Sequence, residues 1–269
     1  MDQRPIGSRV AFFGGSFDPP HLGHLAVARA AQAALGLDTV LFAPVGAQPL
    51  KPHGSTASFE DRLAMTRLAI VDQPGFILSM ADAPKAHGAP NFTIETLLAL
   101  RAELPPGGEI SCLMGADSFA GLKRWHRAAE IPFAAPLIVA SRPGERLADL
   151  KAQLPEGVVV ESELLAEERR SSGAKAHVDS DDVMRGINPL PPFELSFCRE
   201  EIEVVRYILK NSSGDLAPLY LLPGLKISIS ASEIREQLRL REPESTFLPA
   251  PVLDYIRANN LYRDLLPPG

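Results

Sequence analysis

Residues 9–24 have the sequence RVAFFGGSFDPPHLGH, and this stretch decides the expected fold class. The apolar run over 9–15 ends in two glycines, which predicts a buried strand followed by a tight turn. Apolar residues then recur at helical spacing over 22–35, so a helix is expected directly after the turn. Glycines let the backbone approach a ligand closely, and the free amides at a helix N-terminus attract anions. The stretch therefore predicts a strand–loop–helix unit suited to binding polyphosphate.

Strand and helix patterns alternate through the first half of the chain. Apolar runs predict strands over 39–43, 76–79, 109–115 and 136–141. Helical spacing predicts helices over 58–71, 93–103 and 118–130, the first of them capped by Ser58. Such alternation implies a mostly parallel sheet with crossover helices, a Rossmann-like three-layer α/β fold. Ligands of such sheets bind beyond the carboxyl ends of the strands, near the point where strand order reverses.

The pattern changes after Gly144. The segment over 161–182 holds seven acidic and three basic residues, and a proline-rich patch follows over 188–192. We expect a surface insertion at about 150–200 within a single domain that spans 1–269. The remaining patterns predict a helix over 200–210, short strands over 219–222 and 226–229, and closing helices over 231–241 and 250–259.

Composition narrows the class of protein. The chain has 269 residues, 45% of them hydrophobic, which is enough to build its own core. A net charge of −6 argues against a nucleic-acid partner, which requires a basic face. Cys112 and Cys198 lie far apart without metal-ligand spacing, which fits a reducing compartment, and Cys112 is expected in the core. The N-terminal residues 1–8 are too short for a signal peptide, and no apolar stretch reaches membrane-spanning length. We therefore expect a cytoplasmic protein without a membrane partner.

His21 and His24 are three residues apart, so both can lie on one face of the first helical turn. Zinc ligation would need a third ligand, and neither His53 nor His87 has ligand-type neighbours in the sequence. Histidines at a glycine-rich loop can donate hydrogen bonds to phosphate oxygens. We therefore favour phosphate binding over metal binding and expect no metal site built from protein ligands.

A second motif, ISASEIR, covers residues 229–235. Ser230 and Glu233 have capping-box spacing, so a helix should begin near residue 231. Arg235 then falls near the first turn, where the helix dipole disfavours a cation unless it holds an anion. An ordinary capped helix, with Arg235 paired to Glu233 or solvated, explains this segment equally well.

Together, GSFDPPHLGH and ISASEIR resemble the HxGH and ISxTxIR motifs of the nucleotidylyltransferase superfamily. More narrowly, the chain resembles the nicotinate-nucleotide adenylyltransferases. Further similar segments are PVGAQPLKP at 44–52, PNFTIETL at 90–97, GADSFAGLKRW at 115–125 and FLPAPVLDYIRANNLY at 247–262. Leu50 departs from the histidine that many members carry, and Ser232 replaces the commoner threonine while keeping the hydroxyl.

The resemblance implies a reaction of ATP with nicotinate mononucleotide, giving deamido-NAD and pyrophosphate, with Mg²⁺ carried by ATP. It implies catalytic roles for His21, His24, Lys51 and Arg235. It implies ATP binding by Gly14, Gly15, Ser16, Phe17, Gly115, Asp117, Ser230 and Ser232. It implies mononucleotide binding by Asn91, Thr93 and Trp125, the last by stacking on the pyridine ring.

Several alternatives stay open at this point. Asp117 has the spacing of a helix N-cap, and Trp125 has that of a core residue. The acceptor could instead be nicotinamide mononucleotide or phosphopantetheine, and a non-catalytic nucleotide sensor could share the fold. The acidic insertion could host a partner, although a solvated loop explains it more simply. Homo-oligomerisation is also undetermined by the sequence.

Overall fold

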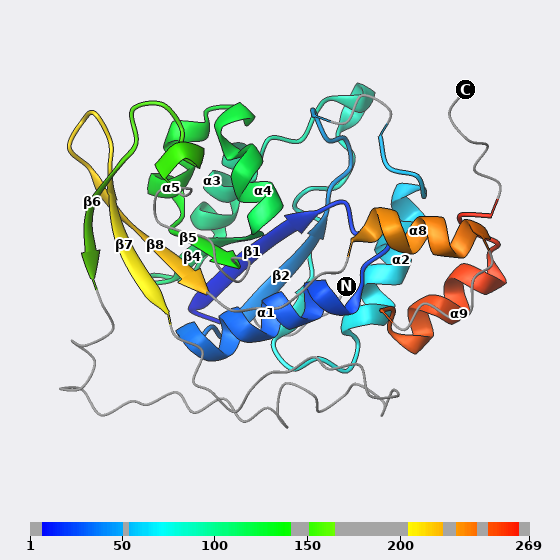
Figure 1. Ribbon diagram of the computed structural model, residues 1–269. Coiled ribbons are helices and arrows are strands. Elements are labelled where there is room, and N and C mark those ends of the chain that lie inside the picture. The colour runs from blue at the N-terminus through cyan, green and yellow to red at the C-terminus, as the bar shows by residue number, and fades with distance from the viewer. Residues whose placement is uncertain are drawn as a thin grey trace.

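The computed structural model describes residues 7–50, 54–140, 151–164, 204–222, 230–240 and 247–263. Within these ranges an eight-stranded sheet runs through the centre of the molecule, in the order β3-β2-β1-β4-β5-β8-β7-β6 (Figure 1). The strands are β1 (Arg9–Gly15), β2 (Thr39–Pro44), β3 (Phe76–Leu78), β4 (Glu109–Gly115), β5 (Leu137–Ala140), β6 (Val159–Leu164), β7 (Val205–Lys210) and β8 (Leu216–Leu222). The pairs from β3 to β8 are parallel, whereas β7 and β6 are added antiparallel at one edge.

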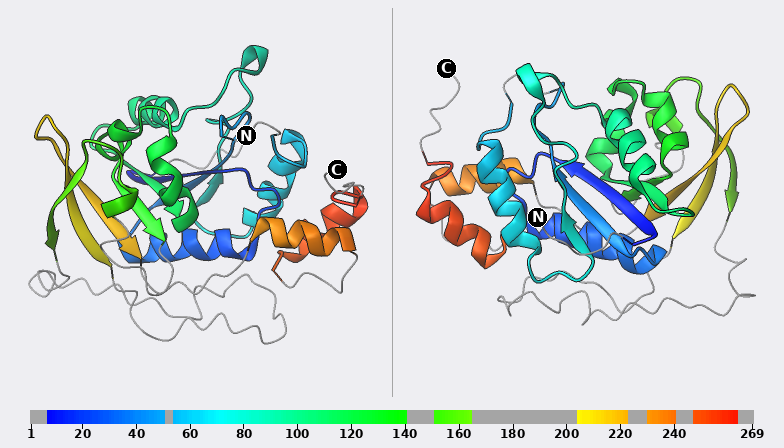
Figure 2. Two further views of the ribbon diagram at one scale, coloured as in Figure 1. Left: turned by 45° about the horizontal axis from the view of Figure 1, so that its top comes forward. Right: turned by 180° about the vertical axis from the view of Figure 1, so that it is seen from behind.

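Helices cover both faces of this sheet, as the two views of Figure 2 show. One hydrophobic cluster joins the sheet to α1 (Leu22–Leu35), α2 (Phe59–Ile70), α8 (Ala231–Leu240) and α9 (Ala250–Ala258). A second cluster joins the opposite face to α3 (Thr93–Glu103), α4 (Ala116–Gly121) and α5 (Ile131–Ala134). The expected three-layer α/β fold with a C-terminal helical portion is therefore confirmed.

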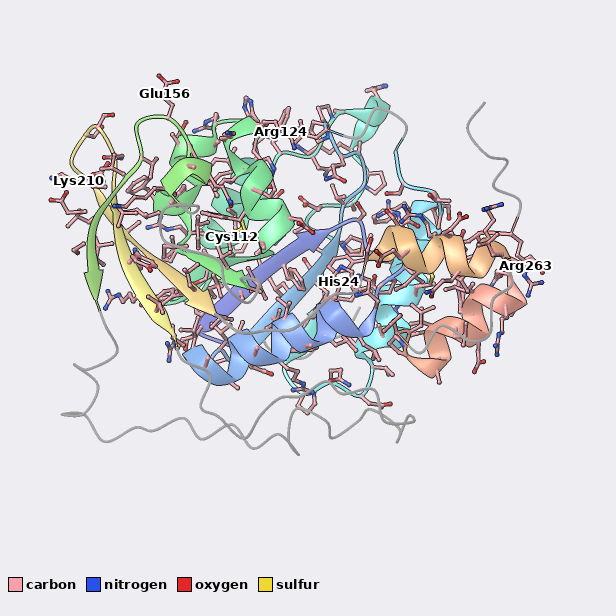
Figure 3. The ribbon with its side chains drawn as sticks, in the orientation of Figure 1. His24, Cys112, Arg124, Glu156, Lys210 and Arg263 are labelled. Carbon is pink, nitrogen blue, oxygen red and sulfur yellow. The ribbon has the colours of Figure 1, made fainter. Side chains whose placement is uncertain are left out.

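Local sequence explains the helices that flank the site. Ala28, Ala30 and Ala31 of α1 are fully buried, and their small side chains let the helix pack closely on the sheet. Ser58 caps α2 as expected, because its hydroxyl accepts a hydrogen bond of 3.0 Å from the backbone N–H of Asp61. Cys112 is buried within β4, and burial raises the pKa of its thiol to about 12, so it is a core residue (Figure 3).

Strand order reverses between β1 and β4. The chain leaves β1 for β2 and β3 on one side and returns to β4 on the other side of β1. The carboxyl ends of the two neighbouring parallel strands, at Gly15 and Gly115, consequently lie at the same edge of the sheet. This is the position at which a ligand is expected in an open α/β sheet.

Two expectations about secondary structure are wrong. The helix predicted over 118–130 is instead α4 followed by two 3₁₀ turns, because Trp125 is extended and Arg127 has a left-handed φ of 51°. Within the helix predicted over 200–210, the residues Val205–Lys210 instead form the strand β7, in which Tyr207 and Leu209 alternate into the core. Pairing with strands on both sides of β7 overrides the helical periodicity there.

Part of the segment predicted as an insertion contributes to the sheet, since β6 pairs with β7 at the edge. Most of the acidic stretch, the proline-rich patch, Cys198 and the strand expected over 226–229 lie outside the described residues. In the described part of the chain, no helix combines the length and apolar character needed to span a membrane.

Candidate active site

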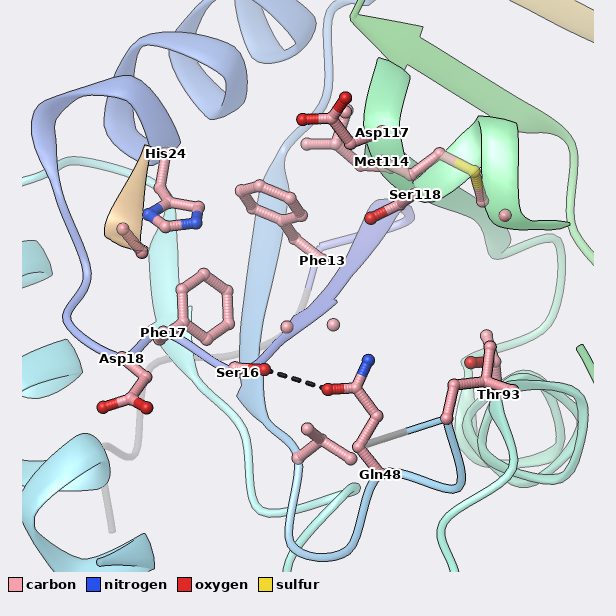
Figure 4. A pocket seen from close by; sticks show the side chains of 18 of the residues that line it. Phe13, Ser16, Phe17, Asp18, His24, Gln48, Thr93, Met114, Asp117 and Ser118 are labelled. Atoms are coloured by element: carbon pink, nitrogen blue, oxygen red, sulfur yellow. Dashed lines mark hydrogen bonds between the residues drawn. The ribbon is translucent and has the colours of Figure 1, made fainter. Parts of the chain in front are cut away.

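A cavity of about 1450 Å³ opens at the reversal point between β1 and β4. We call GSFDPPHLGH at 15–24 the first motif, and its residues 16–21, between β1 and α1, the first-motif loop. The walls of the cavity come from this loop and from the N-terminal ends of α1, α3, α4 and α8 (Figure 4). The predicted site residues that line it are Gly14, Gly15, Ser16, Phe17, His21, His24, Asn91, Thr93, Gly115, Asp117, Trp125, Ser230, Ser232 and Arg235. Lys51 lies outside the described residues.

The loop after β1 turns sharply at Phe17. This residue has a φ of 46°, in the left-handed region that non-glycine residues rarely adopt, and its side chain is 1% exposed. Its ring packs edge-on against Phe13 at 5.6 Å and against His24 at 5.0 Å. Aromatic packing therefore supports an unfavourable backbone conformation at the point where the loop borders the cavity.

The two histidines take different places at the start of α1. His21 is the N-cap residue, and its backbone N–H donates to His24 Nδ1 at 3.2 Å. A neutral His24 must therefore carry its proton on Nε2, which makes Nε2 a donor. The two rings stack with centroids 3.7 Å apart. Among the described residues, His21 Nδ1 is a buried nitrogen without a hydrogen-bond partner.

Both imidazoles are neutral at neutral pH in this state. Burial lowers the pKa of His21 to about 4. Burial also lowers the pKa of His24 well below 6.5, and the nearby charge of a protonated His21 lowers it further. An anion bound against these rings would favour their charged forms and raise both pKa values.

The depressed pKa of His21 predicts acid sensitivity of the fold. In the unfolded chain the His21 imidazole takes up a proton near pH 6.5, whereas in the folded protein it stays neutral down to about pH 4. Its contribution to stability is therefore complete above pH 6.5 and is lost as the pH falls towards 4, by about 3 kcal/mol. Urea unfolding at a series of pH values measures this loss. His21→Gln should show a shallower fall over that window, and an unchanged slope would contradict the prediction.

The second motif is joined to the first by Arg235. Ser230 caps α8, since its hydroxyl accepts from the backbone N–H of Ser232 at 3.2 Å. Arg235 donates to the carbonyl oxygen of Asp18 at 2.7 Å and to the hydroxyl of Ser232 at 3.1 Å. The guanidinium therefore links two segments that lie 217 residues apart in the chain.

Arg62 supports the loop after β1, a role that the sequence analysis missed. Its side chain is 2% exposed and donates to the carbonyl oxygens of Ser16 at 2.7 Å and Val45 at 2.8 Å. Burial lowers the pKa of this guanidinium, and the charge of Asp18 opposes that shift. The sequence could have indicated that Arg62 is buried, because helical spacing places it on the same face of α2 as Met65 and Thr66.

Asp18 lies in the first motif, and the sequence alone predicts no role for it. Its carboxylate is buried and accepts hydrogen bonds from the backbone N–H groups of Thr56 at 2.6 Å and Ala57 at 3.1 Å. It also accepts one from the hydroxyl of Tyr262 at 2.8 Å. Spacing alone could not reveal these partners, because the two segments that supply them are distant in the chain.

The opposite wall is built by α3 and α4. Asn91 accepts from the Ala47 N–H at 2.9 Å and donates to the Ala83 carbonyl at 3.0 Å, so its side chain holds two loops together. Trp125 is partly buried against the second hydrophobic cluster and still lines the cavity. Asp117 is not the N-cap of α4, because that position belongs to Gly115.

Two further contacts shape the cavity. The hydroxyl of Ser16 donates to Gln48 Oε1 at 3.0 Å, which ties the first-motif loop to the loop after β2 (Figure 4). The rings of Phe92 and His126 lie 4.2 Å apart. In the described part of the chain, no group of three or more His, Cys, Asp or Glu side chains could hold a metal ion.

Comparison with known proteins agrees with this geometry. A family model described as cytidylyltransferase-like matches residues 12–237, so the chain is a nucleotidyltransferase of that family. A probable nicotinate-nucleotide adenylyltransferase of Trichlorobacter lovleyi is 32% identical over 95% of this chain and 99% of its own length. One from Aeromonas salmonicida is 32% identical over 98% of this chain and 99% of its own. The chain belongs to the nicotinate-nucleotide adenylyltransferase family.

Solved structures support the fold independently. The nicotinic acid mononucleotide adenylyltransferase of Plasmodium falciparum, solved in complex with NaAD, superposes with a TM-score of 0.59. The alignment covers 97% of this chain and 100% of that one at 16% identity. At this identity the likeness bears on the fold alone.

Proposed function

We propose that the protein transfers the adenylyl group of ATP to nicotinate mononucleotide, giving deamido-NAD and pyrophosphate for NAD biosynthesis. The observation that carries the proposal is the joining of both motifs at one cavity, where Arg235 reaches Asp18 and Trp125 lines the opposite side. A helix N-terminus at each motif supplies backbone amides for phosphate oxygens. The names of the relatives point to the same reaction.

In this mechanism the 5′-phosphate oxygen of the mononucleotide attacks the α-phosphorus of ATP in line. A bond forms between that oxygen and the α-phosphorus, and the bond from the α-phosphorus to the bridging oxygen breaks. Pyrophosphate leaves with the electron pair. The nucleophile is already an anion, so the protein mainly aligns the two substrates and stabilises negative charge.

Each residue then has a definite task. His24 donates from Nε2 to an α-phosphate oxygen, a direction set by the hydrogen bond that occupies its Nδ1. His21, Arg235 and Lys51 bind further phosphate oxygens, and Ser230 and Ser232 add hydroxyl or amide donors. Asp117 binds ribose hydroxyls, because a carboxylate can accept two hydrogen bonds. Mg²⁺ arrives with ATP and is held mostly by phosphates and water.

Steady-state turnover with ATP and Mg²⁺ tests the proposal, with nicotinate and nicotinamide mononucleotide compared side by side. We expect a strong preference for the nicotinate form. Equal use of both would indicate dual specificity. The absence of a dinucleotide product from folded protein would favour a phosphopantetheine acceptor or a non-catalytic sensor.

A cytoplasmic location remains a prediction from cysteine usage.

Replacing Trp125 should separate the two substrates. Trp125→Ala is expected to raise the KM for the mononucleotide by about tenfold, and that for ATP much less, because it removes the stacking surface for the pyridine ring. Trp125→Phe keeps an aromatic face and should retain most of the affinity.

The chain contains a single tryptophan, so its fluorescence reports directly on this site. Titration of the wild type with the mononucleotide should change the emission more than titration with ATP does. Equal effects of Trp125→Ala on both KM values would argue against stacking.

A further inference from the structure

The end of the described chain reaches the first motif through Tyr262. This residue follows α9, has a left-handed φ of 66° and is 5% exposed. Its hydroxyl donates to Asp18 Oδ1 at 2.8 Å across a separation of 244 residues, and it lies 4.0 Å from the sulfur of Met65. Tyr262 itself is not among the residues that line the cavity.

Asp18 is held through both its side chain and its backbone. The carboxylate accepts from two backbone amides, of Thr56 and Ala57, and from the Tyr262 hydroxyl. The carbonyl oxygen of the same residue accepts from Arg235. The position of the carboxylate therefore sets the position of the carbonyl, and with it the place of the guanidinium beside the cavity.

A buried carboxylate is stable only where donors satisfy it. Among the described residues that donate to the Asp18 carboxylate, Tyr262 is the one that does so through its side chain. The two backbone N–H groups could be removed only by proline, which would also restrict the backbone. Burial and the neighbouring carboxylate raise the pKa of the Tyr262 phenol, so it stays protonated and remains a donor. The hydroxyl is thus the one contact to this carboxylate that a single atomic change can delete.

We propose that Tyr262 is a positioning residue for ATP, acting through Asp18 on the first-motif loop and on Arg235. It touches neither substrate. The proposal rests on the assignment of ATP phosphates to His21, His24 and Arg235 in the proposed function. Loss of the hydroxyl lets Asp18 shift and displaces the donors on the ATP side, while the Trp125 side of the cavity, built from α3 and α4, is unaffected.

Tyr262→Phe tests this, with Tyr255→Phe as a matched control. Tyr255 lies on α9 and donates to Oδ1 of Asp61, on α2, at 3.0 Å. Its replacement therefore deletes a tyrosine–aspartate hydrogen bond of the same kind. Asp61, however, does not line the cavity. We expect Tyr262→Phe to raise the KM for ATP by about five- to tenfold and to leave the KM for the mononucleotide within about twofold. Tyr255→Phe should change neither KM, although both variants should lower Tm.

Unchanged KM values in Tyr262→Phe, or an equal rise in both, would overturn the proposal, because either result describes a merely structural tyrosine. A double-mutant cycle adds a second criterion. If Tyr262 acts through Asp18, Tyr262→Phe should have little further effect on the ATP KM in an Asp18→Asn background. If the fold-changes in the ATP KM caused by Tyr262→Phe and Asp18→Asn simply multiply in the double variant, Tyr262 does not act through Asp18.

Two measurements on ATP alone separate this proposal from the proposed reaction. Calorimetric titration with ATP should show the same five- to tenfold weakening in Tyr262→Phe, even if no dinucleotide forms. In the wild type, ATP should slow hydrogen exchange at the amides of Thr56 and Ala57. This measurement uses only the wild-type protein, so it does not depend on whether a variant folds. Unchanged exchange at these amides on ATP binding would count against the coupling, whichever acceptor the enzyme uses.

Discussion

Replacement of His24 by alanine is expected to lower kcat by about 10²-fold or more, the usual cost of removing one donor that stabilises transition-state charge. The structure gives the physical reason. His24 Nδ1 is occupied by the His21 N–H, so the single proton of the neutral ring lies on Nε2. Packing against Phe13 and Phe17 holds that ring in place before ATP binds. Alanine removes both the donor and its fixed orientation.

A second variant separates catalysis from helix capping. His24→Asn keeps an oxygen that can accept from the His21 N–H but has no donor at the position of Nε2. We expect His24→Asn to fold like the wild type and to lose turnover as His24→Ala does. The control is His87→Ala, at an exposed histidine that does not line the cavity. Wild-type kcat in a folded His24→Ala would remove His24 from the mechanism.

Replacement of Arg235 by alanine is expected to lower kcat/KM for ATP by about 10²-fold or more. Two functions are lost together. The substitution removes a cation intended for phosphate, and it removes the hydrogen bonds that join Asp18 to Ser232 across the two motifs. The expected loss is therefore larger than that of a surface ion pair, which contributes about 0–1 kcal/mol.

Lysine at this position tests the geometry of the guanidinium. Arg235→Lys keeps the charge, but a lysine cannot reproduce the rigid fork that reaches both the Asp18 carbonyl and Ser232. We expect it to recover only part of the lost kcat/KM. Arg239→Ala is the matched control, because Arg239 lies one turn further along α8 and pairs with the exposed Glu236. Equal losses in Arg235→Ala and Arg239→Ala would indicate that α8 is merely destabilised.

Much of the fold could be predicted because its signals are local. The expected bounds of 22–35, 93–103 and 109–115 match α1, α3 and β4. Each of these elements has one clear periodicity and is bounded by glycine, proline or a turn. The helix predicted over 200–210 was wrong because the apolar residues of this segment fit both helical and alternating spacing. Only the pairing of β7 with β6 and β8 selects between them.

The candidate site shows the same division. Every predicted residue that the structure describes lines one cavity, because the first motif carries a strand end and a helix start and the second motif carries a helix start. Asp117 and Arg235 each had two local interpretations of equal weight. Spacing could not supply the observed N-cap of α4 at Gly115 or the hydrogen bond from Arg235 to the Asp18 carbonyl. The ribose role of Asp117 and the phosphate role of Arg235 stay predictions.

The sequence was sufficient to predict the class of fold, the helix that begins at Ala231 and the family. Those features depend on residues close together in the chain. The tertiary structure alone decided that Arg62, Arg235 and Tyr262 all hold one loop, through contacts that span 46, 217 and 244 residues. Hydrogen bonds of this kind depend on the distance between atoms in space. They arise only after the hydrophobic faces of the helices have packed on the sheet and brought distant polar groups together, where burial requires each to find a partner.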